Sequence, residues 1–184
     1  MGFKVEREVA EAMDWYQAHH AIEGYKKMKK VLNDDIDMDN TYEVYYEQNV
    51  DSGKFRTEVI SEKELGGEGG VRDVGARVTL AFDIAMWSRT APKSTDEGLF
   101  AVIELNPVAK LVVDMPGDRD KISHRVFRRI WYSLLFREQF DYWVEYAEEE
   151  LNRYINEMRN FYGLEPTTAK SHRVEYEPLV SGNV

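Results

Sequence analysis

An acidic connector is the first candidate for chemistry in this chain, because its aspartates alternate as the ligands of a calcium loop do. Asp35, Asp37 and Asp39 match the first three ligand positions, and Asn40 stands where a tight left-handed residue belongs. The twelfth position should supply a bidentate carboxylate, but it is Tyr46. Calcium takes six to eight oxygen ligands, so we expect a solvated, turn-forming connector and no metal site.

The histidines also fall short of a metal site. His19 and His20 are adjacent and would point about 100° apart on a helix, so both cannot ligate one ion. Glu23 follows His19 by four residues and makes a face of two ligands, but the sequence shows no third. His124 and His172 are isolated.

A glycine cluster from Gly66 to Gly70 lacks the Gly-Lys-Ser/Thr sequence of a phosphate-binding loop, and it joins two predicted strands. No Ser, His and Asp form a recognisable nucleophile motif. The sequence therefore predicts no catalytic residue and no cofactor. Whether the chain is an enzyme stays open, and we favour a non-catalytic protein.

Charge and composition narrow the class of protein. The net charge is -10, which repels phosphate backbones and anionic lipid, so we do not expect a nucleic-acid partner. There is no cysteine, and thiol chemistry and disulfides are excluded. No stretch is apolar enough to span a membrane and no signal core is recognisable, so a cytoplasmic protein is expected. Two basic faces, at helical spacing, could meet acidic partners: Lys26, Lys27, Lys29 and Lys30, and Lys121, His124, Arg125, Arg128 and Arg129.

The 184 residues predict one domain, from residue 1 to 163, followed by an extended or flexible C-terminal tail from 164 to 184. A helical period runs from residue 3 to 33, and we expect helix from about residue 8, with Gly24 as a joint between two helices. Weak alternation from Phe3 to Val9 leaves a short leading strand as the alternative.

Beyond the acidic connector the period changes to two, which predicts an antiparallel meander. Strands are expected over residues 42–47, 55–62, 76–86, 99–105 and 108–115, with a turn at Asp51-Ser52-Gly53. Asn106-Pro107 is expected to interrupt pairing between the last two. In the first strand Tyr42, Val44 and Tyr46 should share one face.

A run without glycine or proline from Asp118 to Tyr162 predicts a long C-terminal helix, or two nearly collinear ones, ended by Gly163. The apolar stripes of its halves do not align, so a bend is expected near Arg137-Glu138-Gln139. The fold class is therefore α+β: an antiparallel meander packed by N-terminal helix or helices and a long C-terminal helix.

In this order of elements the chain resembles the START and Bet v 1-like helix-grip superfamily, over roughly residues 3 to 162. Members of that superfamily often wrap a curved sheet around the last helix and enclose an apolar ligand. The resemblance implies a binding protein for a small apolar ligand or lipid. Its cavity wall would include Phe82, Met86, Ile130 and Trp131.

The competing interpretation, which we slightly favour, is a non-catalytic interaction protein that self-associates through the long helical region. Its second half carries apolar residues in a heptad-like spacing that is too apolar to stay wet if one chain does not cover it. A homo-oligomer, or another protein partner, would cover it. The expected interface residues are Phe140, Val144, Leu151, Tyr154 and Met158.

Overall fold

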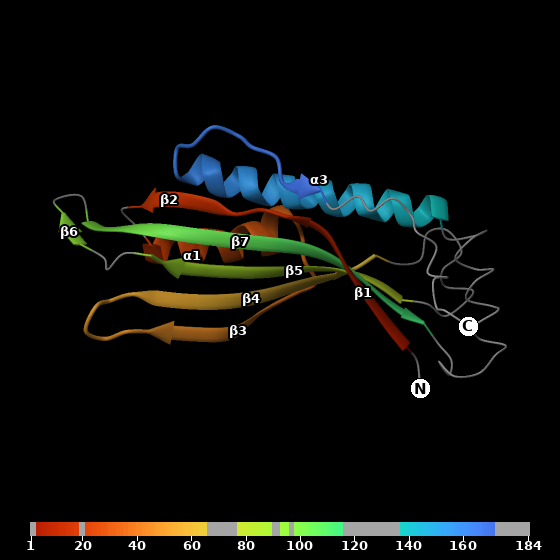
Figure 1. Cartoon of the computed structure of the whole chain (residues 1–184), viewed down its shortest axis with the longest axis horizontal. Helices are drawn as coiled ribbons and strands as arrows, with labels where there is room; N and C mark the ends of the chain where they lie inside the picture. Colours follow the sequence, from red (N-terminus) through yellow and green to blue (C-terminus); the bar gives the residue numbers. More distant parts are fainter. Residues whose placement is uncertain are drawn as a thin grey trace, which may run out of the picture.

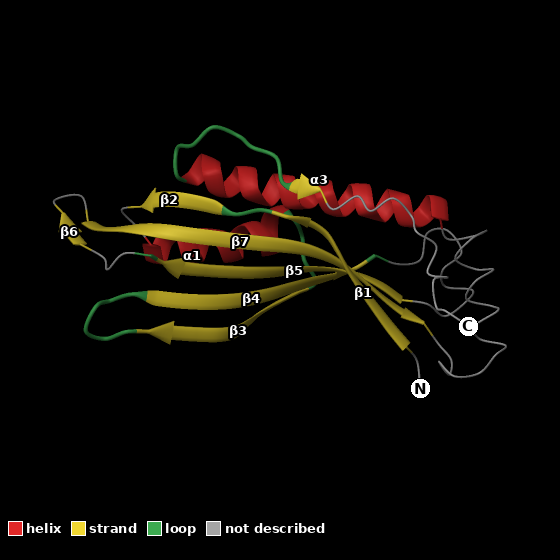
Figure 2. Cartoon of the chain, viewed as in Figure 1, coloured by secondary structure: helices red, strands yellow, loops and turns green. Residues whose placement is uncertain are grey.

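The computed structural model describes residues 3–18, 21–65, 77–89, 93–95, 98–115 and 137–171. It confirms the α+β class: an antiparallel sheet carries helices packed against one face (Figure 1, Figure 2). We call the face toward the helices the inner face and the opposite one the outer face. None of the helices in these ranges combines the length and apolarity that crossing a membrane requires.

The elements follow one another from strand to helix and back. They are β1 (Phe3–Glu11), β2 (Asp14–Ala18), α1 (Ala21–Lys30), a π-helical turn η1 (Val31–Asp35), β3 (Asn40–Gln48), β4 (Phe55–Glu64), β5 (Arg77–Ser88), β6 (Lys93–Thr95), β7 (Gly98–Met115), α3 (Arg137–Phe161) and β8 (Lys170–Ser171).

The strands form a sheet in the order β3-β4-β5-β7-β1-β8, and β2 pairs with β7 beyond the end of β1. Consecutive strands β3, β4, β5 and β7 are antiparallel neighbours, so the predicted meander is confirmed. The predicted turn at Asp51-Ser52-Gly53 is also present. Gly53 has a φ of 68° and donates its N–H to the carbonyl of Asn49 at 2.8 Å.

The prediction of helix from about residue 8 is wrong as far as residue 18, because β1 covers Phe3–Glu11 and β2 covers Asp14–Ala18. The alternative, a leading strand from Phe3 to Val9, is confirmed. A register shift between Glu8 and Ala10, and the change of strand after Glu11, break the alternation of inward residues. Val9 and Tyr16 are buried on strands, yet their spacing imitates a helical period. Helix begins at Ala21 in the described chain, and Gly24 lies inside it.

The predicted interruption at Asn106-Pro107 is wrong as well, since β7 runs unbroken through it. Pro107 stands opposite Ile84 of β5, and its carbonyl accepts the Ala12 N–H at 3.0 Å. The N–H and C=O of a strand residue point to the same side, so the donor that proline lacks faces the gap where β1 gives way to β2. The ladder toward β5 therefore loses nothing.

β3 differs from its predicted alternation by one residue. A bulge between Glu43 and Tyr45 leaves Val44 outside the paired register. Tyr42 therefore pairs with Ile60 on the outer face, whereas Tyr46 pairs with the buried Thr57 on the inner face. The three residues expected on one face are divided between two.

The end of α3 was predicted correctly from Gly163. Its φ of 70° suits glycine, and its N–H reaches the Asn160 carbonyl at 3.0 Å while that of Leu164 reaches the Arg159 carbonyl at 2.8 Å. These two bonds form a Schellman cap. Arg137, Glu138 and Gln139, where the bend was predicted, are the first residues of α3. Residues 118–136, the first half of the predicted long helix, lie outside the described ranges, so the bend stays a prediction.

The first part of the predicted tail is extended and held by the domain. Asn156 and Asn152 of α3 accept the backbone N–H groups of Thr167 and Ala169, at 2.8 and 2.6 Å. The chain then reaches β8, which pairs with β1. Residues 164–171 thus return along α3 to the sheet (Figure 1).

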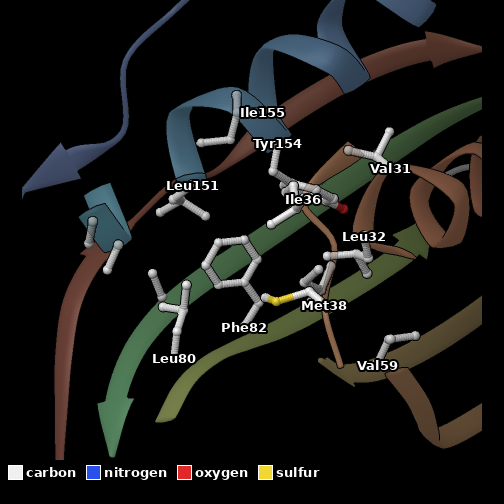
Figure 3. Close-up of a cluster of buried hydrophobic side chains, with 14 of the residues drawn as sticks. Val31, Leu32, Ile36, Met38, Val59, Leu80, Phe82, Leu151, Tyr154 and Ile155 are labelled. Carbon is white, nitrogen blue, oxygen red and sulfur yellow. The ribbon is translucent and has the colours of Figure 1, made fainter. Parts of the chain in front are cut away.

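The core lies between α3, α1 with η1, and the inner face of the sheet (Figure 3). Leu151 and Tyr154 of α3 point toward Phe82 of the sheet. One glycine is required by this packing. A Cβ on Gly24 would stand 1.7 Å from the hydroxyl oxygen of Tyr162 and 2.9 Å from its Cζ.

We predict that Gly24→Ala destabilises the fold by about 1–3 kcal/mol, because the new methyl overlaps the Tyr162 ring. That ring is stacked on Tyr16 with centroids 4.5 Å apart, so it has little room to move. Urea unfolding of both chains measures the difference. The double variant Gly24→Ala, Tyr162→Leu should lose less than the two single changes together. A Gly24→Ala chain more stable than the wild type, as helix propensity alone would give, contradicts the packing.

Candidate functional site

The helical stripe predicted as an interface is covered within one chain. Leu151, Tyr154 and Met158 are fully buried, Phe140 is nearly so and Val144 is half-buried. These side chains belong to the core cluster or pack against it. The apolar stripe was expected at an interface because it would otherwise be wet, and that physical reason is absent.

The residues predicted to line a ligand cavity are divided by the structure. Phe82 and Met86 are fully buried in the core, and the Phe82 ring meets Tyr154 edge-on with centroids 6.2 Å apart. Ile130 and Trp131 lie outside the described ranges.

The aspartates of the acidic connector make separate structural contacts and do not converge on one point. Asp35 lies 3.9 Å from the Lys27 ammonium, and Asp39 accepts the Glu64 N–H at 2.7 Å. Asp37, and not Asn40, is the left-handed residue, with a φ of 58°. No three acidic or histidine side chains within the described ranges are grouped as metal ligands.

Other predicted motifs are only partly visible. Residues 19, 20, 66–70, 121–129 and 172 lie outside the described ranges, and with them both adjacent histidines, the glycine cluster and the second basic face. The basic face of α1 is partly neutralised by its own chain. Lys27 reaches Glu157 of α3 at 3.2 Å, and the Lys29 ammonium lies 4.8 Å from the Tyr25 ring centroid.

A polar cluster is buried where α3 ends beside β2. The Arg159 guanidinium binds both carboxylate oxygens of Asp14, at 2.6 and 2.8 Å. Nearby, the buried hydroxyls of Tyr154 and Tyr162 have no hydrogen-bond partner among the described residues, and the buried Tyr16 hydroxyl lies beside the Asp14 carboxylate. Burial raises the pKa of all three hydroxyls, and for Tyr16 the Asp14 carboxylate adds to the rise. These phenols therefore stay protonated and can act as donors.

The centre of the outer face neutralises its own charge. Lys110 of β7 lies 2.5 Å from Asp83, 3.1 Å from Glu6 and 4.0 Å from Glu8. A hydrogen bond to Asp83 is the main cause that raises the pKa of Lys110. Closer to β2, Glu104 is buried and binds Arg89 and Asn106. The acidic groups in the middle of the sheet thus have cationic or polar partners.

The edge of the sheet at β3 differs from its centre because large apolar side chains are exposed there. We call residues 40–50, which comprise β3 and its first turn residues, the β3 surface. Among the described residues nine large apolar side chains are exposed, and five of them lie here. They are Tyr42, Val44, Tyr45, Tyr46 and Val50, with exposed fractions of 44, 56, 40, 50 and 95%.

The β3 surface is exposed on both faces because the packed helices cover the strands farther in. The contacts of α3 and α1 fall mainly on β7, β1 and each other. Tyr46 points to the inner face and remains half exposed, while Tyr42 and Tyr45 point to the outer one. Such a concentration of exposed aromatic groups is typical of a surface that another molecule covers.

A hollow of about 330 Å³ adjoins this surface at the end of the β3–β4 hairpin. Phe55 and Trp87 give it apolar walls, and charged groups of both signs surround them. Its lining is Glu47, Asn49, Lys54, Phe55, Arg56, Trp87 and Ser88.

Sequence reasoning identified the aromatic and acidic residues of β3 but not their exposure. The alternation predicted a hairpin with one solvent-exposed face. That β3 is an edge strand follows from the order of all the strands in the sheet, which the sequence of a single strand does not reveal. The unusual density of tyrosine between Tyr42 and Tyr46 was the available signal.

Comparisons with known proteins do not identify a family. No protein-family model matches the chain, and no curated protein is significantly similar in sequence. Among solved structures, a protein of unknown function, SA2116 from Staphylococcus aureus, aligns at a TM-score of 0.27 and 9% identity. The alignment covers 88% of this chain and 95% of that one.

We predict that Tyr154→Phe leaves the chain as stable as the wild type or more stable by about 1 kcal/mol, because it removes a buried donor that has no partner in the described part of the chain. Equilibrium unfolding in urea provides the measurement. As the control, Thr57→Val removes a buried hydroxyl that donates to the Tyr45 carbonyl at 3.2 Å, and it should cost stability. A clear loss for Tyr154→Phe would mean that its hydroxyl has a partner in solution.

Proposed function

We propose that this chain is a non-catalytic interaction protein that binds another polypeptide through the β3 surface. The observation that carries the proposal is the cluster of exposed apolar residues along one edge strand. Tyrosine is enriched at protein interfaces because its ring offers contact area and its hydroxyl stays solvated.

The position of β3 at the edge of the sheet is a second reason to propose that it binds a polypeptide. An edge strand presents unpaired backbone N–H and C=O groups, which an extended segment of another chain can use. β3 spans nine residues, long enough for a partner segment to make several contacts. The adjoining hollow with Phe55 and Trp87 could receive one anchoring side chain.

The proposal keeps the interaction function expected from the sequence and moves its surface. The stripe on α3 is already used in the core, so association through it would require the domain to open. Whether the bound polypeptide is a second copy or another protein is decided by the experiment below.

A small-ligand binder of helix-grip type is the second candidate. It is favoured by the buried hydroxyls of Tyr154 and Tyr162, because these side chains belong to or pack against the core cluster that holds Phe82 and Met86. A ligand with an acceptor group would satisfy such donors. Native mass spectrometry of the purified chain would then show additional mass, lost on Tyr154→Phe.

We predict that a photo-reactive benzoylphenylalanine at position 46 cross-links a partner in cells that naturally contain the protein, whereas the same group at position 142 does not. Tyr142 is the matched control, since it is 63% exposed but lies on α3 away from the β3 surface. The mass of the adduct distinguishes a second copy from another protein.

Competition with untagged chain tests whether the cross-link is specific. Untagged chain carrying Tyr142→Glu should suppress the adduct as well as wild type does, and chain carrying Tyr46→Glu should be at least about tenfold weaker. Both changes should leave folding intact, because each replaces an exposed side chain. Equal adducts at positions 46 and 142, or none at 46, would contradict the proposal.

A further inference from the structure

We propose that the polypeptide bound at the β3 surface is a basic, extended segment of another protein. This inference rests on the proposed function and adds the chemistry of the partner. It starts from a charge asymmetry in the chain. Between Lys30 and Lys54 there are seven carboxylates and no lysine or arginine: Asp34, Asp35, Asp37, Asp39, Glu43, Glu47 and Asp51.

Few cations in the described structure lie beside these carboxylates. Asp35 has Lys27 at 3.9 Å, Arg56 stands opposite Glu47 in the strand register, and the Lys63 ammonium donates to the Ile36 carbonyl at 3.0 Å. The hydrogen bonds that the carboxylates of β3 accept come from neutral donors. Glu43 accepts a hydrogen bond from the Tyr25 hydroxyl, and Glu47 accepts one from the Tyr45 hydroxyl. These hydrogen bonds orient the Glu43 and Glu47 carboxylates.

The same chain pairs its acids elsewhere. On the outer face Lys110 draws Asp83, Glu6 and Glu8 around one ammonium, and Arg89 binds the buried Glu104. The excess of carboxylates over cations between Lys30 and Lys54 is therefore a local feature of β3 and its flanking turns, and not only of the acidic composition. Such a field attracts a cationic segment and speeds its association.

Exposed tyrosines beside carboxylates suit lysine and arginine in a second way. A guanidinium can lie over the ring while it bonds to a carboxylate. The chain already contains this arrangement at the β3 surface, where the Arg56 guanidinium lies 5.7 Å from the Tyr45 ring centroid and bonds to Glu58 at 2.6 Å. A partner's arginine could bind to Tyr42 or Tyr46 in the same manner.

The edge also disfavours a second copy in this position. Two β3 strands side by side would bring their carboxylates together, and like charges across a strand pair are destabilising. The bulge at Val44 and the inward-pointing Glu43 are devices that protect an edge from uncharged, apolar strands. A basic segment is the occupant for which those devices are favourable.

The test uses a synthetic peptide of about eight residues, the length of a strand, in which arginine and threonine alternate. A matched peptide alternates glutamate and threonine. Each is titrated into the full chain while backbone amide resonances are recorded by NMR. We expect the arginine peptide to shift resonances of residues 40–50, and raising salt from about 50 to about 500 mM to weaken binding at least about tenfold.

Charge variants separate local recognition from overall attraction. Glu47→Gln with Asp51→Asn should weaken binding of the arginine peptide about tenfold, because Glu47 is an exposed residue of the β3 surface and Asp51 is the exposed residue that follows it. Asp141→Asn with Glu149→Gln removes the same charge from exposed positions of α3 and should have little effect. The amide spectra also report whether each variant is folded.

Several results would overturn the inference: no binding of the arginine peptide, equal binding of the glutamate peptide, or equal weakening by both charge-variant pairs. The cross-link from position 46 tests the proposed function separately. If that adduct forms and the arginine peptide does not bind, the β3 surface remains the interface and its partner is not basic. If the adduct is a dimer of this chain, the inference is also wrong.

Discussion

Burial of the apolar stripe of α3 against the inner face of the sheet is the interaction on which the rest of the fold depends. Leu151, Tyr154 and Met158 are fully buried there, and each such side chain contributes about 1.5–3 kcal/mol. The ion pair between Arg159 and Asp14 fixes the end of the helix to β2. Because the stripe is used within the chain, the association that we propose uses another surface.

The parts of the fold that could be predicted are those in which one period runs long enough to exclude another. β5 alternates over twelve residues, and Gly163 ends α3 where its left-handed conformation is needed. β1 and β2 were missed because a register shift and a change of strand gave their inward residues a helical spacing. Pro107 was misread because its effect depends on which neighbour faces its missing N–H.

The residue types of the candidate site could be read from the sequence, but their exposure could not. The tyrosines and glutamates of β3 are plain in the sequence, but their exposure follows from strand order and from how far α1 and α3 extend over the sheet. The bulge at Val44, which divides Tyr42 and Tyr46 between two faces, has no signal in the residues themselves. The exposed aromatic side chains of β3 favour contact with a partner, whereas its carboxylates disfavour an uncharged, apolar strand. For a basic segment both features are favourable, which is the basis of the partner that we propose.

Hydroxyl-radical footprinting of the dilute chain tests most directly whether the α3 stripe is covered while the β3 surface is open. The account predicts rapid oxidation of Tyr45 and Tyr46 and strong protection of Tyr154 and Met158. Met13, which is 64% exposed, calibrates an open methionine. Oxidation of Met158 at a rate near that of Met13, or protection of both β3 tyrosines in the dilute chain, would contradict it.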